Sequence, residues 1–243
     1  MKDSLFDNMR RVENGHWWFV TRRKIIGKVM DKFCPDKHAR IFDVGCGTGD
    51  NLGFLAAHGR VTAMEKHDTA LAYARARNIG NVYEGNLPDG IPDEVGGDYD
   101  IIVMFDVLEH IEDDARCLSI LLEHAKGKGK LILTVPAYRF LWSNHDIIHH
   151  HKRRYTSANL RKALEANGWR VNYISYFNTL LFPAALIVRI MEKFRPPEGN
   201  AELTMPPIWL NTILKNIFQL ECHFIGSVSL PFGLSIIAVA EKA

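Results

Sequence analysis

The chain is predicted to fold as an α/β protein, with a mostly parallel sheet that is covered by helices on both faces. Two observations predict this class. Short apolar segments such as residues 41–44 and 101–105 alternate with longer segments of helical periodicity. Glycine-rich turns at 45–49 and 127–129 stand between such segments. Residues 101–105 are apolar without alternation, as expected for a central strand that is buried on both faces.

Composition limits the classes of function. The 243 residues, of which 47% are hydrophobic, can bury one full core, and one continuous α/β pattern favours a single domain. The net charge of +2 is dispersed, so we expect no nucleic-acid partner. No C-x-x-C pair occurs, which argues against a zinc site and a disulfide framework and favours a reducing compartment. The cysteines are Cys34, Cys46, Cys117 and Cys222.

The sequence shows neither a secretion signal nor a membrane span. The N-terminal residues lack an apolar core, and no apolar run reaches the roughly 18 residues that a span requires. We therefore expect a cytoplasmic protein. The apolar C-terminal third leaves open a peripheral position at the inner membrane face.

The segment Arg40 to Asp50, RIFDVGCGTGD, is the one around which the chain is organised. A short apolar strand ends near Asp43, and the glycines that follow allow a positive φ and close approach to a ligand. The next helix directs its free N–H groups at the same point, so a nucleotide-type site is expected at the carboxyl edge of the sheet. A dinucleotide motif places its third glycine where this chain has Asp50, which disfavours a nicotinamide cofactor.

With Asp43, the turn reads D-x-G-x-G-x-G and resembles the first motif of class I S-adenosylmethionine (SAM)-dependent methyltransferases. The chain is most similar to the small-molecule enzymes that resemble ubiquinone-biosynthesis O-methyltransferases. The resemblance covers residues 20–175 and the last strand, and it implies a Rossmann-like seven-stranded sheet with SAM as cofactor. The residues that it implies for SAM binding are Arg22, Asp43, Gly45, Cys46, Gly47, Gly49, Glu65, Asn86, Leu87 and Phe105.

Some of these contacts have a chemical reason. Glu65 ends the second strand about 20 residues after Asp43, the spacing of an acid that accepts both ribose hydroxyls, although a solvated strand-end acid is the alternative. Asn86 stands where the family usually has Asp, and its side-chain carbonyl can still accept a hydrogen bond from the adenine amine. Arg22 resembles an Arg that contacts SAM in the quinone enzymes. The alternative is that Arg22 belongs to a solvated basic turn of a helix, and that the aromatic residues of this helix pack on the core.

The segment Phe105 to His110, FDVLEH, resembles the fourth methyltransferase motif, whose first residue abuts the cofactor. Asp106, Glu109 and His110 have the spacing of one face of a helix, which we expect to begin here and run through Glu123. Similar quinone O-methyltransferases have Glu at the first of these positions and use the three as a divalent-metal site. We expect helix capping instead, and no metal.

Residues 145–155 form the densest polar stretch of the chain. No Cys or Glu joins its four histidines, so a metal is not expected. The stretch is similar to an acceptor-side loop of bacterial small-molecule methyltransferases, and a histidine can serve as base near neutral pH. The catalytic candidates are His145, His151, Asp146 and His110. The candidates for substrate binding are Trp18, Trp142, Arg153, Arg154 and Tyr155. Alternatively, the last three residues only tie the loop to the sheet.

We divide the chain into an N-terminal helical cap (1–35), a SAM-binding core (36–175), an apolar helical insertion (176–226) and the last strand (227–243). The insertion has helical patterns at 176–190 and 208–224, with a Pro-rich link at 195–207 between them. A lid over an apolar acceptor, a helix lying on a membrane and a homodimer face remain open for it, and the lid is favoured.

The expected function is transfer of the methyl group of SAM to a small or lipid-like acceptor, most readily at a hydroxyl oxygen. Methylation of N or C on a sugar or natural-product intermediate is one alternative. A SAM-binding regulator without catalysis is another.

Overall fold

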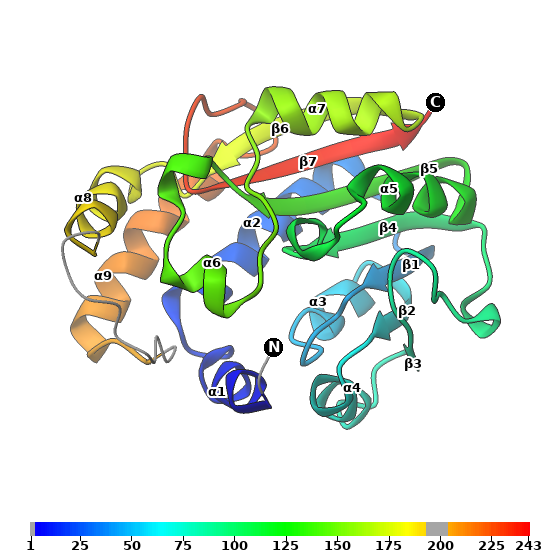
Figure 1. Ribbon diagram of the computed structural model, residues 1–243, viewed down its shortest axis with the longest axis horizontal. Helices are drawn as coiled ribbons and strands as arrows, with labels where there is room; N and C mark the ends of the chain where they lie inside the picture. Colours follow the sequence, from blue (N-terminus) through cyan, green and yellow to red (C-terminus); the bar gives the residue numbers. More distant parts are fainter. Residues whose placement is uncertain (1–2, 193–203) are drawn as a thin grey trace.

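A computed structural model describes residues 3–192 and 204–243, and its strands form one seven-stranded sheet (Figure 1). The strand order is β3-β2-β1-β4-β5-β7-β6. Strand β7 runs antiparallel to β5 and β6, and all other neighbours are parallel. The strands are β1 Ala39–Val44, β2 Gly59–Glu65, β3 Asn81–Glu84, β4 Tyr99–Phe105, β5 Ala125–Pro136, β6 Trp169–Phe177 and β7 Ser235–Lys242.

Helices and short 3₁₀ turns connect these strands. The helices are α1 Asp3–Val12, α2 Trp17–Phe33, α3 Leu52–Ala56, α4 Asp68–Arg75, α5 Asp114–His124, α6 Asn144–Ile148, α7 Ser157–Ala166, α8 Phe182–Glu192 and α9 Ile208–Gln219. The 3₁₀ turns are η1 Asp93–Val95, η2 Leu108–His110, η3 Arg139–Leu141 and η4 Leu220–His223.

The sheet is covered on both faces, as its apolar strands predict. Alternate residues of a strand point to opposite faces, so Phe42 and Val44 pack with α5 and α7, whereas Ile41 packs with α2, α3 and α9. Figure 1 shows α5 and α7 in front of the sheet and α2 behind it. The expected Rossmann-like α/β fold is confirmed.

The strand order places a ligand site between β1 and β4. From β1 the chain builds the sheet outward through β2 and β3, and it then returns to add β4 and β5 on the other side of β1. The carboxyl ends of β1 and β4 therefore diverge into loops at a topological switch point, where α/β sheets bind ligands.

Two predicted boundaries are wrong. The helix expected from residue 106 begins only at Asp114, because Asp113 is its N-cap and accepts a hydrogen bond from the Arg116 N–H. Before it, residues 108–110 form the separate turn η2. The sixth strand continues to Phe177, so residues 176 and 177 belong to β6 and not to the apolar insertion.

The C-terminal third contains the two expected apolar helices, α8 and α9. Most of the predicted Pro-rich link, residues 195–203, lies outside the described residues. Among the helices that the structure does describe, none has the length and apolar content to cross a bilayer.

Candidate functional site

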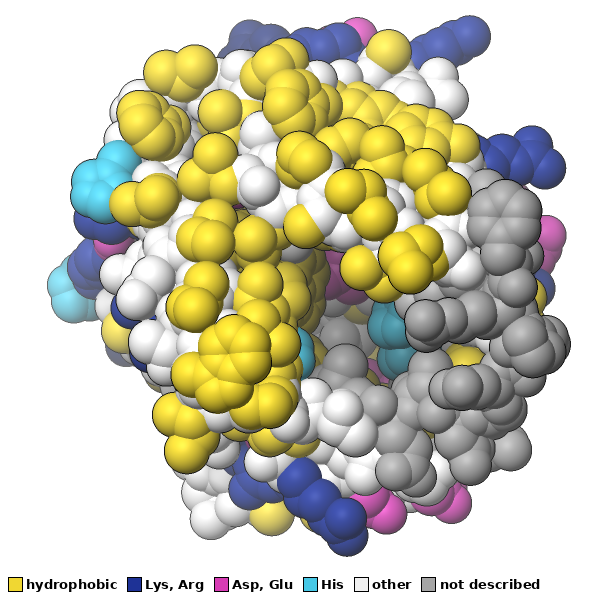
Figure 2. Space-filling model, turned by 90° about the vertical axis from the view of Figure 1, so that its left-hand side faces the viewer, with side chains coloured by type: hydrophobic (Ala, Val, Ile, Leu, Met, Phe, Trp, Pro, Cys, Tyr) yellow, Lys and Arg dark blue, Asp and Glu magenta, His cyan; other side chains and the backbone are white. Residues whose placement is uncertain are grey.

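A cavity of about 790 Å³ lies at the carboxyl ends of β1 and β4. It is lined by the glycine turn, the end of β2, residues 105–111, the loop before α7, and residues of α1, α2 and α8. Figure 2 shows it as a hollow in which histidine and acidic side chains are visible. Predicted residues that line it are Trp18, Arg22, Gly45, Cys46, Gly47, Glu65, Asn86, Leu87, Phe105, His110, His145, His151 and Arg154.

The glycine turn has the conformation that its sequence predicts. Gly45, Gly47 and Gly49 all have positive φ values, between 57° and 76°. A Cβ atom on Gly45 would lie 2.8 Å from a methyl carbon of Val107, so this position also requires glycine for space. The Gly45 N–H donates to the carbonyl of Met64 at 2.8 Å, which fixes the turn against β2.

Glu65 joins the glycine turn to the end of β2. Its Oε2 accepts a hydrogen bond from the Gly47 N–H at 2.8 Å, and its Oε1 accepts from the N–H groups of Lys66 and His67 at 2.9 Å. The side chain is largely buried and borders the cavity. A carboxylate in this position can accept hydrogen bonds from the hydroxyl groups of a ribose, while the backbone N–H groups fix its orientation.

Two further predicted cofactor residues, Asp43 and Gly49, do not line the cavity. Asp43 is almost fully buried and does not line the cavity. Burial raises the pKa of Asp43 to about 7, the charge of Glu65 adds to the rise, and Arg22 opposes it. Gly49 also lies outside the cavity lining, where an added Cβ would come within 3.0 Å of the Ala74 Cα.

Arg22 reaches the site from α2, as predicted, but its partner is Asp106. The guanidinium lies 2.5 Å from Asp106 Oδ2, donates to Thr134 Oγ1 at 3.2 Å, and stands over the ring of Phe105. Asp106 was expected to share a helical face with Glu109 and His110, but its carboxylate is bound to Arg22 and is not part of the group of potential ligands that those two residues form.

The sequence analysis missed Glu13, which fastens the segment after α1 to the glycine turn. Its side chain is 1% exposed, accepts a hydrogen bond from Thr48 Oγ1 at 2.5 Å, and pairs with Arg10 and Arg77. Helix α1 also lines the cavity through Leu5, Phe6 and Met9. No local sequence signal marks Glu13, because Thr48 and Arg77 lie 35 and 64 residues away along the chain.

The acceptor-side loop is built around Asp146, whose carboxylate is fully buried. Arg154 donates to it through Nε at 2.7 Å and Nη2 at 3.0 Å, and His151 donates through Nδ1 at 2.8 Å. Burial alone would raise the pKa of Asp146, but these hydrogen bonds outweigh it and hold that pKa well below its usual range. Asp146 therefore fixes the His151 ring and leaves its Nε2 available to the cavity.

Three other histidines of the cavity, His110, His145 and His149, are neutral at pH 7. Burial, followed by the charges of neighbouring histidines, lowers the pKa of His110 and His145 to about 3 and that of His149 to about 4. The rings of His145 and His149 lie 4.1 Å apart between centroids, and those of His110 and His151 lie 4.7 Å apart. All these rings line the cavity.

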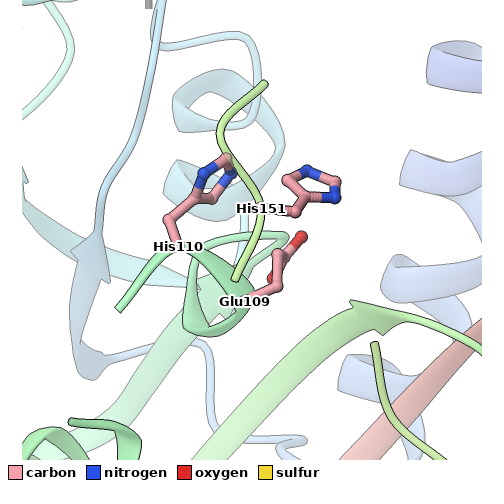
Figure 3. Close-up of side chains that lie close together, drawn as sticks. All are labelled: Glu109, His110 and His151. Atoms are coloured by element: carbon pink, nitrogen blue, oxygen red, sulfur yellow. The ribbon is translucent and has the colours of Figure 1, made fainter. Parts of the chain in front are cut away.

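Three side chains from two segments converge: Glu109 and His110 from η2, and His151 from the acceptor-side loop (Figure 3). One potential ligand atom of each lies within 4.8 Å of the others. Glu109 is fully buried, and neither carboxylate oxygen has a hydrogen-bond partner among the described residues. Burial and the charge of Asp106 raise the pKa of Glu109 well above its usual range, against the charges of Arg22 and Arg154.

This group has the ligand types of a divalent-cation site, but it is not the set that the sequence motif suggested. Asp106 is bound to Arg22, and His151 takes its place beside Glu109 and His110. The expected alternative, that the motif residues cap a helix, is also wrong, because Asp113 caps α5.

Three predicted substrate residues lie outside the cavity lining: Trp142, Arg153 and Tyr155. The Tyr155 hydroxyl donates to Asp114 Oδ2 at 2.7 Å, and Arg153 pairs with Asp114 Oδ1 at 2.8 Å. These bonds tie the loop to the start of α5, whereas the alternative considered for these residues was a tie to the sheet. The backbone provides that tie, because the Tyr155 N–H donates to the carbonyl of Pro136 in β5 at 3.0 Å. Arg154 has both roles, since it borders the cavity and also donates to the carbonyl of Ala137.

Comparison with known proteins decides the family. Residues 19–174 match the family model of a methyltransferase domain. The chain belongs to this family. The resemblance to class I SAM-dependent methyltransferases is thereby confirmed, with SAM as the cofactor of the family.

Relatives of this chain include other methyltransferases. A ubiquinone biosynthesis O-methyltransferase of Rickettsia bellii is 31% identical over 138 residues, which are 55% of this chain and 55% of that protein. This methyltransferase chain spans about half the length of the curated relatives it matches. Its fold is similar to magnesium protoporphyrin IX methyltransferase from Synechocystis, solved with bound SAH (TM-score 0.57, 17% identity, 98% of this chain and 94% of that one). It also resembles a chain in the complex of the Haloferax volcanii Trm112 methyltransferase activator with a methyltransferase (TM-score 0.63, 15% identity, 99% and 96%).

Proposed function

We propose that this methyltransferase transfers the methyl group of SAM to a hydroxyl oxygen of a small or lipid-like acceptor, with His151 as the base. The observation that carries the proposal is the pair of Asp146 and His151, of which His151 lines the same cavity as the glycine turn. Such a pair can accept a hydroxyl proton and stabilise the imidazolium that forms.

The residues around the glycine turn fit SAM. Gly45 has no room for a side chain, the Gly47 N–H and Glu65 face one another, and Phe105, Asn86 and Leu87 complete this side of the cavity. When bound, SAM supplies an electrophilic methyl group on its sulfonium. The protein then has to place an oxygen in line with that group and exclude water.

His151 is the base that the geometry favours. Its Nδ1–H is engaged by Asp146, so Nε2 is the ring atom that can accept a proton. His145 is the second candidate, since its lowered pKa keeps it neutral but makes it a weaker base. His110 is third, for the same reason.

The acceptor side favours an apolar molecule. Ala185 and Val188 of α8 line the cavity, so this helix forms part of the wall and can act as a lid over the acceptor. We propose that the insertion contains this lid and also provides peripheral membrane contact. SAM binding without catalysis would leave His151 without a role. Methylation of N or C on a sugar intermediate would also release a proton, but the apolar wall formed by Ala185 and Val188 disfavours a sugar as the acceptor.

Single substitutions of the histidines test the proposal. His151→Ala is expected to lower turnover by roughly 10²-fold while SAM affinity stays nearly constant, because the base acts on the acceptor only. Labelled SAM with a cell lysate, read by mass spectrometry, identifies the methylated acceptor on which turnover is measured. His145→Ala tests the second candidate, and His38→Ala, at an exposed position remote from the cavity lining, is the control. Parental turnover in both cavity variants, with SAM still bound, would contradict histidine base catalysis.

Cofactor choice is tested separately by calorimetry. SAM and its demethylated product are expected to bind with a Kd of about micromolar magnitude. Tighter binding of a nicotinamide dinucleotide would contradict the assignment.

A further inference from the structure

The strongly exposed apolar side chains of this molecule are confined to one part of the chain. Among the described residues, every large hydrophobic side chain that is strongly exposed lies between Phe140 and Phe232. Their yellow side chains border the hollow of the cavity along its upper and left sides (Figure 2). The apolar face, as we name these residues, comprises Phe140, Ile147, Leu180, Ile187, Val188, Ile190, Met191, Met205, Ile208, Trp209, Ile213, Leu220, Phe224, Val228 and Phe232.

Helix α9 illustrates why this surface needs a non-aqueous partner. Phe218 on its inner side is fully buried, and Leu214 and Ile217 pack beside it against the core. On its outer side, Ile208 is 87% exposed and Trp209 is 64% exposed. A helix that faced water would carry polar residues on this side, so α9 is built to contact apolar material on both sides.

A row of lysines borders this face. Lys24, Lys28 and Lys32 are exposed at successive four-residue steps along α2. Lys24 donates to the Gln219 side chain at 2.9 Å, and Lys32 lies 3.5 Å from Ser227 Oγ, so the row runs beside the exposed part of the apolar face around Leu220, Phe224 and Val228. An apolar surface with lysines along its edge matches the acyl region and the anionic headgroups of a membrane leaflet.

We infer that the apolar face docks on an anionic lipid bilayer, with α8 and α9 lying in the membrane surface and the cavity mouth facing the lipid. The inference rests on the proposed function, since the bilayer would then deliver a lipid-like acceptor to the mouth. It extends beyond the predicted insertion, because Phe140, Ile147, Val228 and Phe232 lie outside residues 176–226. A protein that covered this face would also cover the mouth through which the acceptor must pass.

Vesicle flotation of the full chain tests this. The protein is expected to bind vesicles of phosphatidylcholine mixed with phosphatidylglycerol. Its binding to vesicles of phosphatidylcholine alone should be at least about tenfold weaker. The pair Trp209→Glu with Ile213→Glu should weaken binding at least about tenfold, because it places charge in the apolar contact. The triple change Lys24→Glu, Lys28→Glu and Lys32→Glu should do the same by repelling the headgroups.

Matched controls separate docking from general charge effects. Lys37→Glu, Lys126→Glu and Lys128→Glu alter the net charge equally at other exposed positions and should leave vesicle binding unchanged. Retained SAM affinity shows that each variant is folded. Absence of binding to the mixed vesicles, equal loss in the control, or a dimer in ultracentrifugation that the Trp209 and Ile213 changes dissociate would overturn the inference.

The assay is also independent of catalysis. Vesicle binding together with a water-soluble methyl acceptor would support the docking surface and reject the lipid-like acceptor. Methylation of a lipid in detergent without any vesicle binding would do the reverse.

Discussion

At the scale of single residues, the acceptor side depends on an ordered chain of three side chains. Arg154 holds Asp146 with two hydrogen bonds, and Asp146 in turn holds His151. Loss of Arg154 would therefore leave a fully buried carboxylate without its cation, a change that is costly in proteins. The position of the His151 ring therefore depends on Arg154, which does not itself take part in the proton transfer.

Glu65 provides the most direct test of the cofactor side. Glu65→Ala removes an acceptor for ribose hydroxyls and the bond to the Gly47 N–H, so we expect SAM affinity to fall by about 2 to 3 kcal/mol. Glu84→Ala is the matched control, because Glu84 is exposed and pairs with Glu65 in register at the end of the adjacent strand. Calorimetry measures both variants, and an affinity unchanged by Glu65→Ala would show that other groups hold the ribose.

The cluster of Glu109, His110 and His151 leads to a test by metal removal. Turnover is expected to survive a strong chelator, because the positive charges of Arg22 and Arg154 already act on the Glu109 carboxylate and His151 is engaged by Asp146. Activity lost on chelation and restored by zinc or manganese would show that the cluster is a metal site. A Glu109→Gln variant that no longer responds to added metal would locate it.

The two sides of the site differ in how far the sequence predicts them. Asp43, the glycines and Glu65 are predictable, because each stands at the end of a strand or in a turn whose chemistry is local. The contact of Glu109 with His151 is not, since it depends on the path of a loop through space. The same holds for Glu13, whose partners come from distant segments.

At the scale of elements, Glu13, a buried acid directly after α1, holds this helix to the glycine turn. Glu13→Ala would leave Arg10 and Arg77 facing each other without the carboxylate between them, so we expect α1 to detach more often from the glycine turn. Hydrogen exchange of residues 3–12 should become faster, and SAM should dissociate faster. Asp36→Ala, at an exposed position, is the control, and unchanged protection of α1 would reject this role.

The acceptor-side loop should be sensitive to acid. His110, His145 and His149 have lowered pKa values in the folded protein, so the unfolded chain binds more protons between pH 6.5 and about 4. The stability that these neutral rings contribute is present above pH 6.5 and is lost as the pH falls towards their folded values. Thermal unfolding followed from pH 7 to pH 4 should show this loss, and the double variant His145→Gln, His149→Gln should show less of it. Equal acid loss in both proteins would contradict the assignment.

Helix boundaries show where element prediction failed. The spacing of Asp106, Glu109 and His110 imitates a helical face, but Asp106 has a positive φ of 57° and the chain bends before α5 starts. The short helix α6 was also missed, because five residues are too few to show helical periodicity. The start of α7 does have a local signal, since Thr156 is an N-cap that accepts from the Asn159 N–H.

At the scale of the whole molecule, the α/β class and the end of the sheet at which ligands bind follow from local patterns of apolar segments and turns. The arrangement of the apolar face around the cavity mouth does not. Residues that look like buried helix in the sequence are exposed here, because α8 and α9 lie at the edge of the molecule and not between layers (Figure 1). Periodicity identifies a helix, but it does not identify what covers the helix.

The position of β7 has a consequence for how the protein is made. This strand is the last described element of the chain, yet it occupies an interior place between β5 and β6. Until residues 235–242 leave the ribosome, β5 and β6 each present an unpaired edge, and unpaired edges invite pairing with other chains. The nascent protein therefore cannot close its sheet before residues 235–242 are made, and a chain that terminates before them would expose both edges at once.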